Sequence, residues 1–244
     1  RWCSWSCVDY AMPLVREKVK ELVRGLVANY DLDGIEYDFN RHFILFRSVA
    51  LGGVASKDEV EAMTQLMRDL RTITEEAGRR RGRPIVISVR TPDSVAYALA
   101  GGCDLETWFG NRLVDVWIGG AYFLMNQWSE SVAIARKYGV PFCASLDETR
   151  IQNAAWRQKL PVIPGRTSLP FYVARYSAAM EAGAKSVYLF NLEDHYLTEM
   201  ASVDPAQTEG MEKIYFSADR GSDGYLPEHW IKDGRRFNRM VQID

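Results

Sequence analysis

Short apolar segments alternate with amphipathic segments along most of this 244-residue chain, and that alternation is the strongest constraint on its fold. Five stretches are predicted to be helical, at residues 13–30, 57–78, 103–112, 129–138 and 169–182. Five apolar runs are predicted to be strands, at residues 34–39, 85–90, 114–119, 140–146 and 186–192. Near-continuous apolar runs are typical of strands that are covered on both faces of a parallel sheet. The sequence therefore predicts an α/β fold with five adjacent parallel strands in chain order.

Two architectures fit this pattern, a (β/α)8 TIM-type barrel and an open doubly wound sheet. Neither GxGxxG after a strand nor GxxxxGK[ST] occurs, which argues against the usual nucleotide-binding form of the open sheet. The chain starts at Arg1, and Trp2–Ser6 alternates large and small side chains, as at the end of an earlier strand. We therefore expect residues 1–200 to form the later part, about strands 3–8, of a TIM-type barrel that is incomplete at its N-terminus. Residues 201–244 are expected to form an irregular C-terminal exit segment.

The composition of the chain argues against several classes of binding partner. The chain has 30 Lys and Arg against 32 Asp and Glu, a net charge of −2, which argues against a nucleic-acid partner. No apolar run of about 18 residues occurs, so no membrane span is expected. The first ten residues lack the layout of a signal peptide, and a secreted or periplasmic location is favoured over a cytoplasmic one. The four cysteines match no zinc-binding pair, although Cys3 and Cys7 could pair with each other.

The strongest local signal is DGIEYDFNRH at residues 33–42. Side chains alternate along a strand, so Glu36 and Asp38 share one face and the apolar residues around them share the other. The apolar face can pack against outer helices while the two carboxyl groups point into the barrel, one layer apart. Because a carboxylate there is costly unless it is paired or hydrogen-bonded, the two acids indicate either function or an ion pair with an inward arginine such as Arg90.

A longer pattern surrounds this strand, with Pro-x-Val-Arg at a helix start followed by Tyr-Asp-x-Asp-Gly-Ile-x-x-Asp. The matching positions are Pro13, Val15, Arg16, Tyr30, Asp31, Asp33, Gly34, Ile35 and Asp38. Through them the chain resembles bacterial glycosyl hydrolases of the glycosyl-hydrolase-like barrel type, which are distantly similar to alpha-amylases. Further similar blocks are residues 104–108, 113–120 and 186–191. The resemblance implies a (β/α)8 barrel, glycosidase activity and a carbohydrate substrate.

In alpha-amylase-like barrels the acid at the end of this strand is the catalytic nucleophile, so the resemblance implies that role for Asp38. Those enzymes carry an arginine two residues earlier, where this chain has Glu36, which leaves open a different acid pair formed by Glu36 and Asp38. Glycoside hydrolysis needs two carboxyl groups, roughly 5–5.5 Å apart for retention and 6.5–9.5 Å for inversion. Asp147 and Glu148 after the fourth strand, and Asp194 after the fifth, are further candidate partner acids.

Other residues near strand ends are candidates for substrate binding. They are Arg41, His42, Arg90, Tyr122, Trp128, Asn191, Asp194 and His195. The cations would suit a uronate, sulfated or sialylated sugar, unless Arg41 and Arg90 only neutralise the two acids. The rings of Tyr122 and Trp128 could stack on sugars, with burial in the core as the alternative. No HxH or HExxH spacing occurs, so no metal or other cofactor is expected.

Together these features predict a glycoside hydrolase that acts on a poly- or oligosaccharide, with an anionic glycan as one option, by two-carboxylate acid/base catalysis. Two alternatives remain open from the sequence. One is a catalytically inactive barrel that binds carbohydrate. The other is a metal-dependent hydrolase of the carbohydrate deacetylase type. The sequence does not define the oligomeric state.

Overall fold

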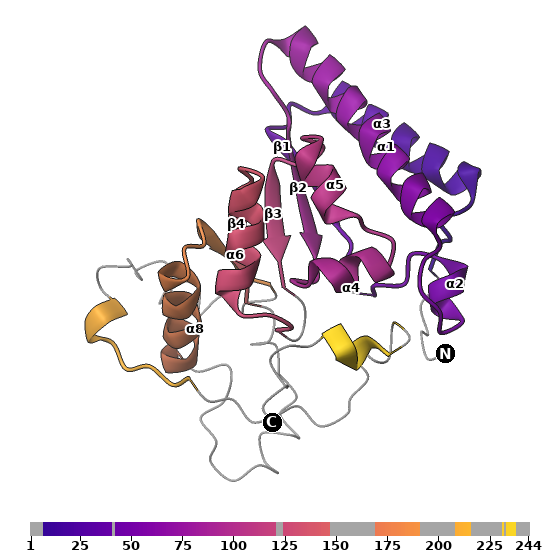
Figure 1. Cartoon of the computed structure of the whole chain (residues 1–244). Helices are drawn as coiled ribbons and strands as arrows, with labels where there is room; N and C mark the ends of the chain where they lie inside the picture. The colour runs from indigo at the N-terminus through magenta and orange to yellow at the C-terminus, as the bar shows by residue number, and fades with distance from the viewer. Residues whose placement is uncertain are drawn as a thin grey trace, which may run out of the picture.

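The structure, a computed structural model, describes residues 7–40, 42–120, 124–146, 169–190, 208–215, 231 and 233–237 (Figure 1). Its strands are β1 (Gly34–Asp38), β2 (Val86–Thr91), β3 (Val116–Gly119), β4 (Phe142–Ser145) and β5 (Ser186–Tyr188). Its helices are α1 (Pro13–Asn29), α2 (Arg47–Ala50), α3 (Lys57–Arg81), α4 (Val95–Ala100), α5 (Leu105–Gly110), α6 (Trp128–Lys137) and α8 (Leu169–Glu181). Two 3-10 turns follow, η2 (Thr208–Gly210) and η3 (Gly234–Phe237).

The five strands form one parallel sheet in the order β1-β2-β3-β4-β5. The predicted α/β class and the predicted strand order are therefore confirmed. The register places Glu36 opposite Ser88 and Asp38 opposite Arg90. Within the described ranges no further strand pairs with the outer edge of β1 or of β5, so the closed barrel stays a prediction. The same holds for the boundary expected at residue 200, because only parts of the segment 201–244 are described.

The long helix α3 shows how local sequence signals define an element. Its predicted capping box is present, since Ser56 Oγ accepts from Glu59 N at 3.2 Å and Glu59 Oε2 accepts from Ser56 N at 2.7 Å. The helix runs to Arg81, three residues beyond the predicted end, and stops at Gly82, whose φ of +77° suits glycine. Lys20 on the neighbouring helix α1 pairs with Asp69 of α3 at 3.2 Å.

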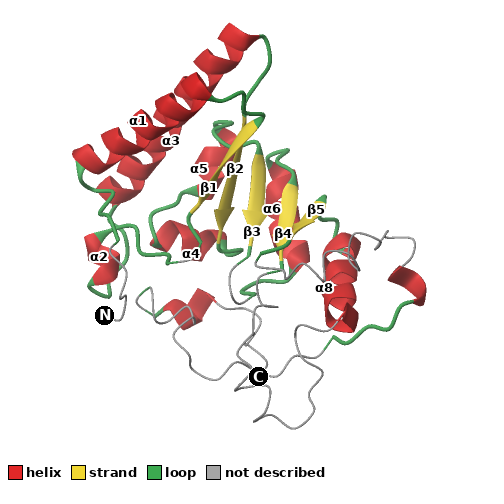
Figure 2. Cartoon of the chain, turned by 180° about the vertical axis from the view of Figure 1, so that it is seen from behind, coloured by secondary structure: helices red, strands yellow, loops and turns green. Residues whose placement is uncertain are grey.

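One face of the sheet packs against helices through large apolar side chains. In Figure 2 the strands lie in front of α5 and α6, so the view looks onto the opposite face. Trp117 of β3 and Phe142 of β4 are 0% and 2% exposed, with ring centroids 4.9 Å apart. The indole Nε1 of Trp117 donates to Thr91 Oγ1 at 2.8 Å, which satisfies its one buried polar atom. This face carries the core of the molecule.

The opposite face of the same strands is more polar. The register puts the side chains that alternate with the core residues on this face. They include Glu36 and Asp38 on β1, Arg90 on β2 and Tyr188 on β5. Glu36 and Asp38 are exposed, although they lie on a strand that is half-buried overall. The predicted separation of the acids from the apolar residues of DGIEYDF is therefore confirmed.

Two further expectations concern membrane insertion and cysteines. Among the described helices, none has the length and apolar character that crossing a bilayer requires. Cys103 and Cys143 are buried thiols without a disulfide bond. The alternative in which Cys3 pairs with Cys7 is not addressed, because Cys3 lies outside the described residues.

Candidate active site

Asp38 is the last residue of β1 and therefore lies where the parallel strands end. Its Oδ2 accepts from Arg90 Nη1 at 2.7 Å, and its Oδ1 accepts from Asn40 N at 2.8 Å. Asn40 is itself buried, and its side-chain Nδ2 donates to the carbonyl oxygen of Gly120 beyond β3. The Asp38 side chain is nevertheless 37% exposed, so this acid is both oriented and accessible. These features suit a group that meets a substrate.

Arg90 is buried next to Asp38 and two aromatic rings. It is 1% exposed and pairs with Asp38. Its guanidinium carbon lies 5.1 Å from the centroid of the Tyr188 ring and 4.2 Å from that of Phe190. Contacts of this kind stabilise a cation over an aromatic face. The expected position of Arg90 beside Asp38 is confirmed, but its burial favours the alternative in which it neutralises the acid instead of binding an anionic sugar.

Glu36 has a different environment from Asp38, although both lie on the same strand. Its Oε1 accepts from the Tyr188 hydroxyl group at 3.2 Å. Glu36 is exposed but still partly removed from water, and this partial burial raises its pKa above the usual range; the hydrogen bond from Tyr188 lowers the pKa, and the charge of Asp38 raises it again. Glu36 is therefore the acid of the pair that holds a proton more readily than an ordinary glutamate.

Tyr188 belongs to this site and was not among the predicted residues. Burial, followed by the charge of Glu36, raises the pKa of Tyr188 to about 12, so its hydroxyl group is a donor at neutral pH. The alternation within SVYLFN places Tyr188 on the same face as Ser186, which pairs with Cys143 of β4. That alternation in the sequence could have predicted the face on which Tyr188 lies. The contact with Glu36 could not be predicted from it, because the contact depends on the curvature of the sheet.

Asp93 follows β2 and shows that an acid near a strand end is not always a site. It is fully buried, and its carboxylate accepts from Asn126 N at 2.7 Å and from Met125 N at 3.0 Å. Its backbone oxygen accepts from Asn126 Nδ2 and from Ser131 Oγ, both at 3.1 Å. Asp93 therefore anchors the segment between β3 and α6.

The structure does not bring every predicted site residue to the polar face. Trp128 is 4% exposed at the start of α6, and its ring packs 6.0 Å from Phe142 on the helix side of the sheet. Its predicted role in sugar stacking is corrected to a core role, because a stacking ring must be accessible. His42 is half-buried. The remaining candidates lie outside the described residues: Arg41, Tyr122, Asp147, Glu148, Asn191, Asp194 and His195.

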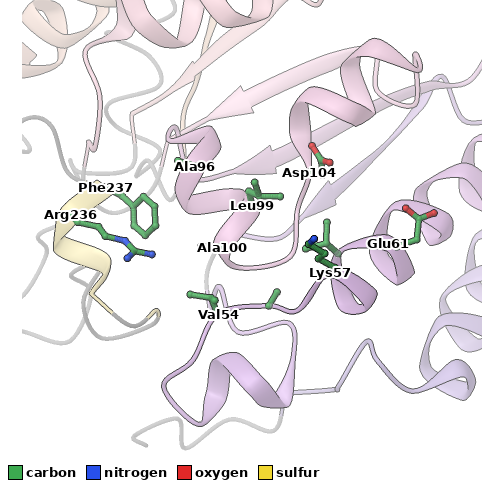
Figure 3. A pocket seen from close by; sticks show the side chains of 11 residues that line it. Val54, Lys57, Glu61, Ala96, Leu99, Ala100, Asp104, Arg236 and Phe237 are labelled. Carbon is green, nitrogen blue, oxygen red and sulfur yellow. The ribbon is translucent and has the colours of Figure 1, made fainter.

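A separate groove of about 590 Å³ lies between the start of α3, α4 and η3 (Figure 3). Its apolar lining includes Val54, Leu99 and Phe237. Its two acids have partners, since Glu61 pairs with Arg68 at 2.6 Å and Asp104 caps α5. None of its described lining residues belongs to a strand, so this groove is distinct from the site around Asp38.

Two comparisons bear on the identity of this site. Searches of the sequence against protein-family models and against curated proteins find no match. Over the ranges that the structure describes, no three His, Cys, Asp or Glu side chains gather into a potential metal site. The described side chains that can carry chemistry at this site are Glu36, Asp38, Arg90 and Tyr188.

Proposed function

We propose that this chain is a glycoside hydrolase that acts on a poly- or oligosaccharide, with Asp38 and Glu36 at its active site. One observation carries the proposal: two carboxyl groups share the polar face of a parallel sheet, near its carboxyl edge, with different partners. Asp38 pairs with a guanidinium group at 2.7 Å, and Glu36 accepts from a phenol at 3.2 Å. Function in parallel β/α proteins gathers at this edge.

The proposed catalytic roles follow from these environments. Glycoside hydrolysis needs one carboxyl group that donates a proton to the glycosidic oxygen and one carboxylate that attacks the sugar or activates water. Burial raises the pKa of Glu36, which suits the proton donor. Asp38, beside the Arg90 cation, suits the carboxylate, in agreement with the resemblance. Asp147 and Glu148 remain candidate partner acids from the sequence.

We further propose that the sheet is part of a (β/α)8 barrel, and the curvature of the sheet supports this. Strands lie about 4.8 Å apart, so β1 and β5 would lie about 19 Å apart in a flat five-stranded sheet. Nevertheless, Tyr188 on β5 donates to Glu36 on β1 at 3.2 Å. Only a strongly curled sheet brings these two edges within reach of each other, and such curling is what closes a barrel.

The proposed substrate is either a neutral or an anionic glycan. Arg90 is buried against Asp38, so we do not assign it to a substrate carboxylate or sulfate. An anionic glycan would then depend on Arg41 and His42. Neutral and anionic oligosaccharides therefore both belong in the test.

The test is to incubate the protein with panels of neutral and acidic oligosaccharides, with and without a chelator, and to measure released reducing ends. The proposal predicts cleavage of at least one substrate that the chelator does not abolish. Release of acetate that stops with chelator would support the deacetylase alternative instead. Binding of oligosaccharides without release of any product would support the inactive barrel.

A further inference from the structure

Tyr188 contacts Glu36 and also Arg90, the partner of Asp38. Its hydroxyl group donates to Glu36 Oε1 at 3.2 Å. The centroid of its ring lies 5.1 Å from the guanidinium carbon of Arg90, which in turn holds Asp38 at 2.7 Å. One side chain from the far edge of the sheet therefore reaches one acid directly and the other through an arginine.

The backbone at Tyr188 is fixed by hydrogen bonds to the neighbouring strand. Tyr188 lies opposite Ser145 in the pairing of β4 with β5, and its carbonyl oxygen accepts from Leu146 N at 3.0 Å. Arg90 is held likewise, because its carbonyl oxygen accepts from Phe39 N at 2.9 Å. Side chains on paired strands are held in a more defined geometry than side chains on loops, so this placement is suited to orienting other groups.

We propose that Tyr188 is a positioning residue of this site, which aims the Glu36 carboxyl group through its hydroxyl group and supports the Arg90–Asp38 pair through its ring. The inference rests on the proposed function for its meaning in catalysis. Its physical content, the orientation of two named carboxyl groups, does not require a substrate.

A packing role alone does not account for this geometry. Phe190 also contacts the Arg90 cation, at 4.2 Å, without any hydroxyl group, so packing against the arginine does not require a phenol. The acceptor Glu36 is exposed, and a hydrogen bond to an exposed carboxylate adds little to stability. The hydroxyl group therefore has its main effect on the orientation and protonation of Glu36.

Two substitutions separate the two contacts of Tyr188. Tyr188→Phe removes only the hydroxyl group, and Tyr188→Leu removes the ring as well. Tyr138→Phe is a matched control, because the Tyr138 hydroxyl group donates to Glu106 at 2.8 Å on the surface away from the strands. The groups that act on Glu36 in these titrations are Asp38, Arg90 and Tyr188, and Glu36 in turn acts on Cys143.

The measurement is an NMR titration of the Glu36 side-chain carboxyl carbon, in the whole chain without ligand, together with the chemical shift of the Asp38 carboxyl carbon at neutral pH. Tyr188→Phe should move the Glu36 midpoint to higher pH, because a donor to its carboxylate form is lost. Tyr188→Leu should move the Glu36 midpoint and also change the Asp38 chemical shift, because the ring that contacts Arg90 is lost as well. Tyr138→Phe should change neither. On a cleaved substrate, Tyr188→Phe should lower kcat by about tenfold with little change in KM.

A Glu36 titration that is the same in Tyr188→Phe as in the unaltered protein would overturn the inference, whatever the activity. If the midpoint moves as expected but no oligosaccharide is cleaved, the positioning role stands and the proposed function fails. If cleavage is found and Tyr188→Phe reduces kcat without moving the midpoint, the tyrosine acts on the substrate instead of on Glu36, and the inference is again overturned.

Discussion

On the helix side of the sheet, Trp117 and Phe142 are buried against each other, whereas on the opposite side Glu36 and Asp38 of the same sheet remain exposed. The two faces are built from alternating residues of the same strands. The helix side shields large apolar surfaces from water and carries the energy of folding. The polar side has two acids, an arginine and a tyrosine in mutual contact, which the core does not need. Residues that stabilise the fold and residues that can react therefore lie on opposite faces of one sheet.

Asp38 ends β1 and Asp93 follows the neighbouring strand β2, but the two aspartates have different environments. Asp93 is fully buried and accepts backbone hydrogen bonds from two residues, while Asp38 has a side chain that is 37% exposed and lies against Arg90. Both are acids near carboxyl ends of strands. Only the exposed acid, Asp38, can contact a ligand. Exposure and hydrogen-bond partners therefore distinguish a candidate catalytic acid from a structural one, and position along a strand does not.

The largest expected effect on stability is that of Trp117→Ala. The indole is fully buried and its Nε1 atom has an acceptor, so its removal should leave a cavity and cost about 3–5 kcal/mol of the free energy of unfolding. Urea unfolding measures this cost. In the fraction that stays folded, the Glu36 titration should be unchanged, and a large change there would mean that the two faces are not separate.

Asp93→Asn should cost roughly 2–4 kcal/mol, because an amide NH₂ group would replace one carboxylate oxygen and face the buried Met125 N donor, while the remaining oxygen would lose its negative charge. Asp104→Asn is the matched control, since Asp104 caps α5 and asparagine is an equally good cap. Both are measured by urea unfolding. Equal stability of the two variants would contradict the assignment of Asp93 as an anchor.

Thr91→Val tests a single contact on the helix side. It preserves the shape of the side chain but removes the acceptor of the Trp117 indole Nε1–H group, which lies 2.8 Å from it. The expected loss is about 1–2 kcal/mol, less than for either variant above. Thr72→Val is the control, because Thr72 lies on the exposed surface of α3 and should show a smaller loss. A Thr91→Val variant as stable as the unaltered protein would mean that this bond contributes nothing net.

The smallest effect on stability should come from Glu36→Gln, and it should depend on pH. The pKa of Glu36 is raised in the folded state, so the folded chain binds this proton more tightly than the unfolded chain. Stability then falls as pH rises through that pKa. Glu36→Gln should therefore be slightly more stable than the unaltered protein at neutral pH, with the gain vanishing below pH ~4. A loss of stability at neutral pH would contradict the assigned direction.

Local patterns predicted much of this fold. Apolar runs located all five strands and their order, and Ser56 with Glu59 located the start of α3. Adjacent strands in register also brought Arg90 to Asp38, as the sequence indicated. Such features depend on residues close in the chain or on strands that neighbour one another, which is why a sequence can show them. The short helices α2 and α4 were missed, because four and six residues are too few to establish a period.

The rest depends on tertiary shape. The contact between Tyr188 and Glu36 joins the two edge strands, so it exists only because the sheet curls. The burial of Trp128 depends on how α6 docks against β4, which its position after a strand could not indicate. Likewise, Asp93 becomes an anchor only through the path of the segment that ends at Asn126.

The most direct test of the central claim is the kcat/KM of Asp38→Asn on an oligosaccharide that the unaltered protein cleaves. The account predicts a fall of at least ~10³-fold, a loss of about 4 kcal/mol of transition-state stabilisation, in protein shown to be folded by circular dichroism. Asp33→Asn is the matched control, because Asp33 pairs with Arg83 at the other end of β1, and it should keep normal turnover. Should Arg90 without its partner prevent folding, Asp38→Asn combined with Arg90→Met removes the unpaired buried charge and should show the same fall. Near-normal kcat/KM in folded Asp38→Asn would contradict the account.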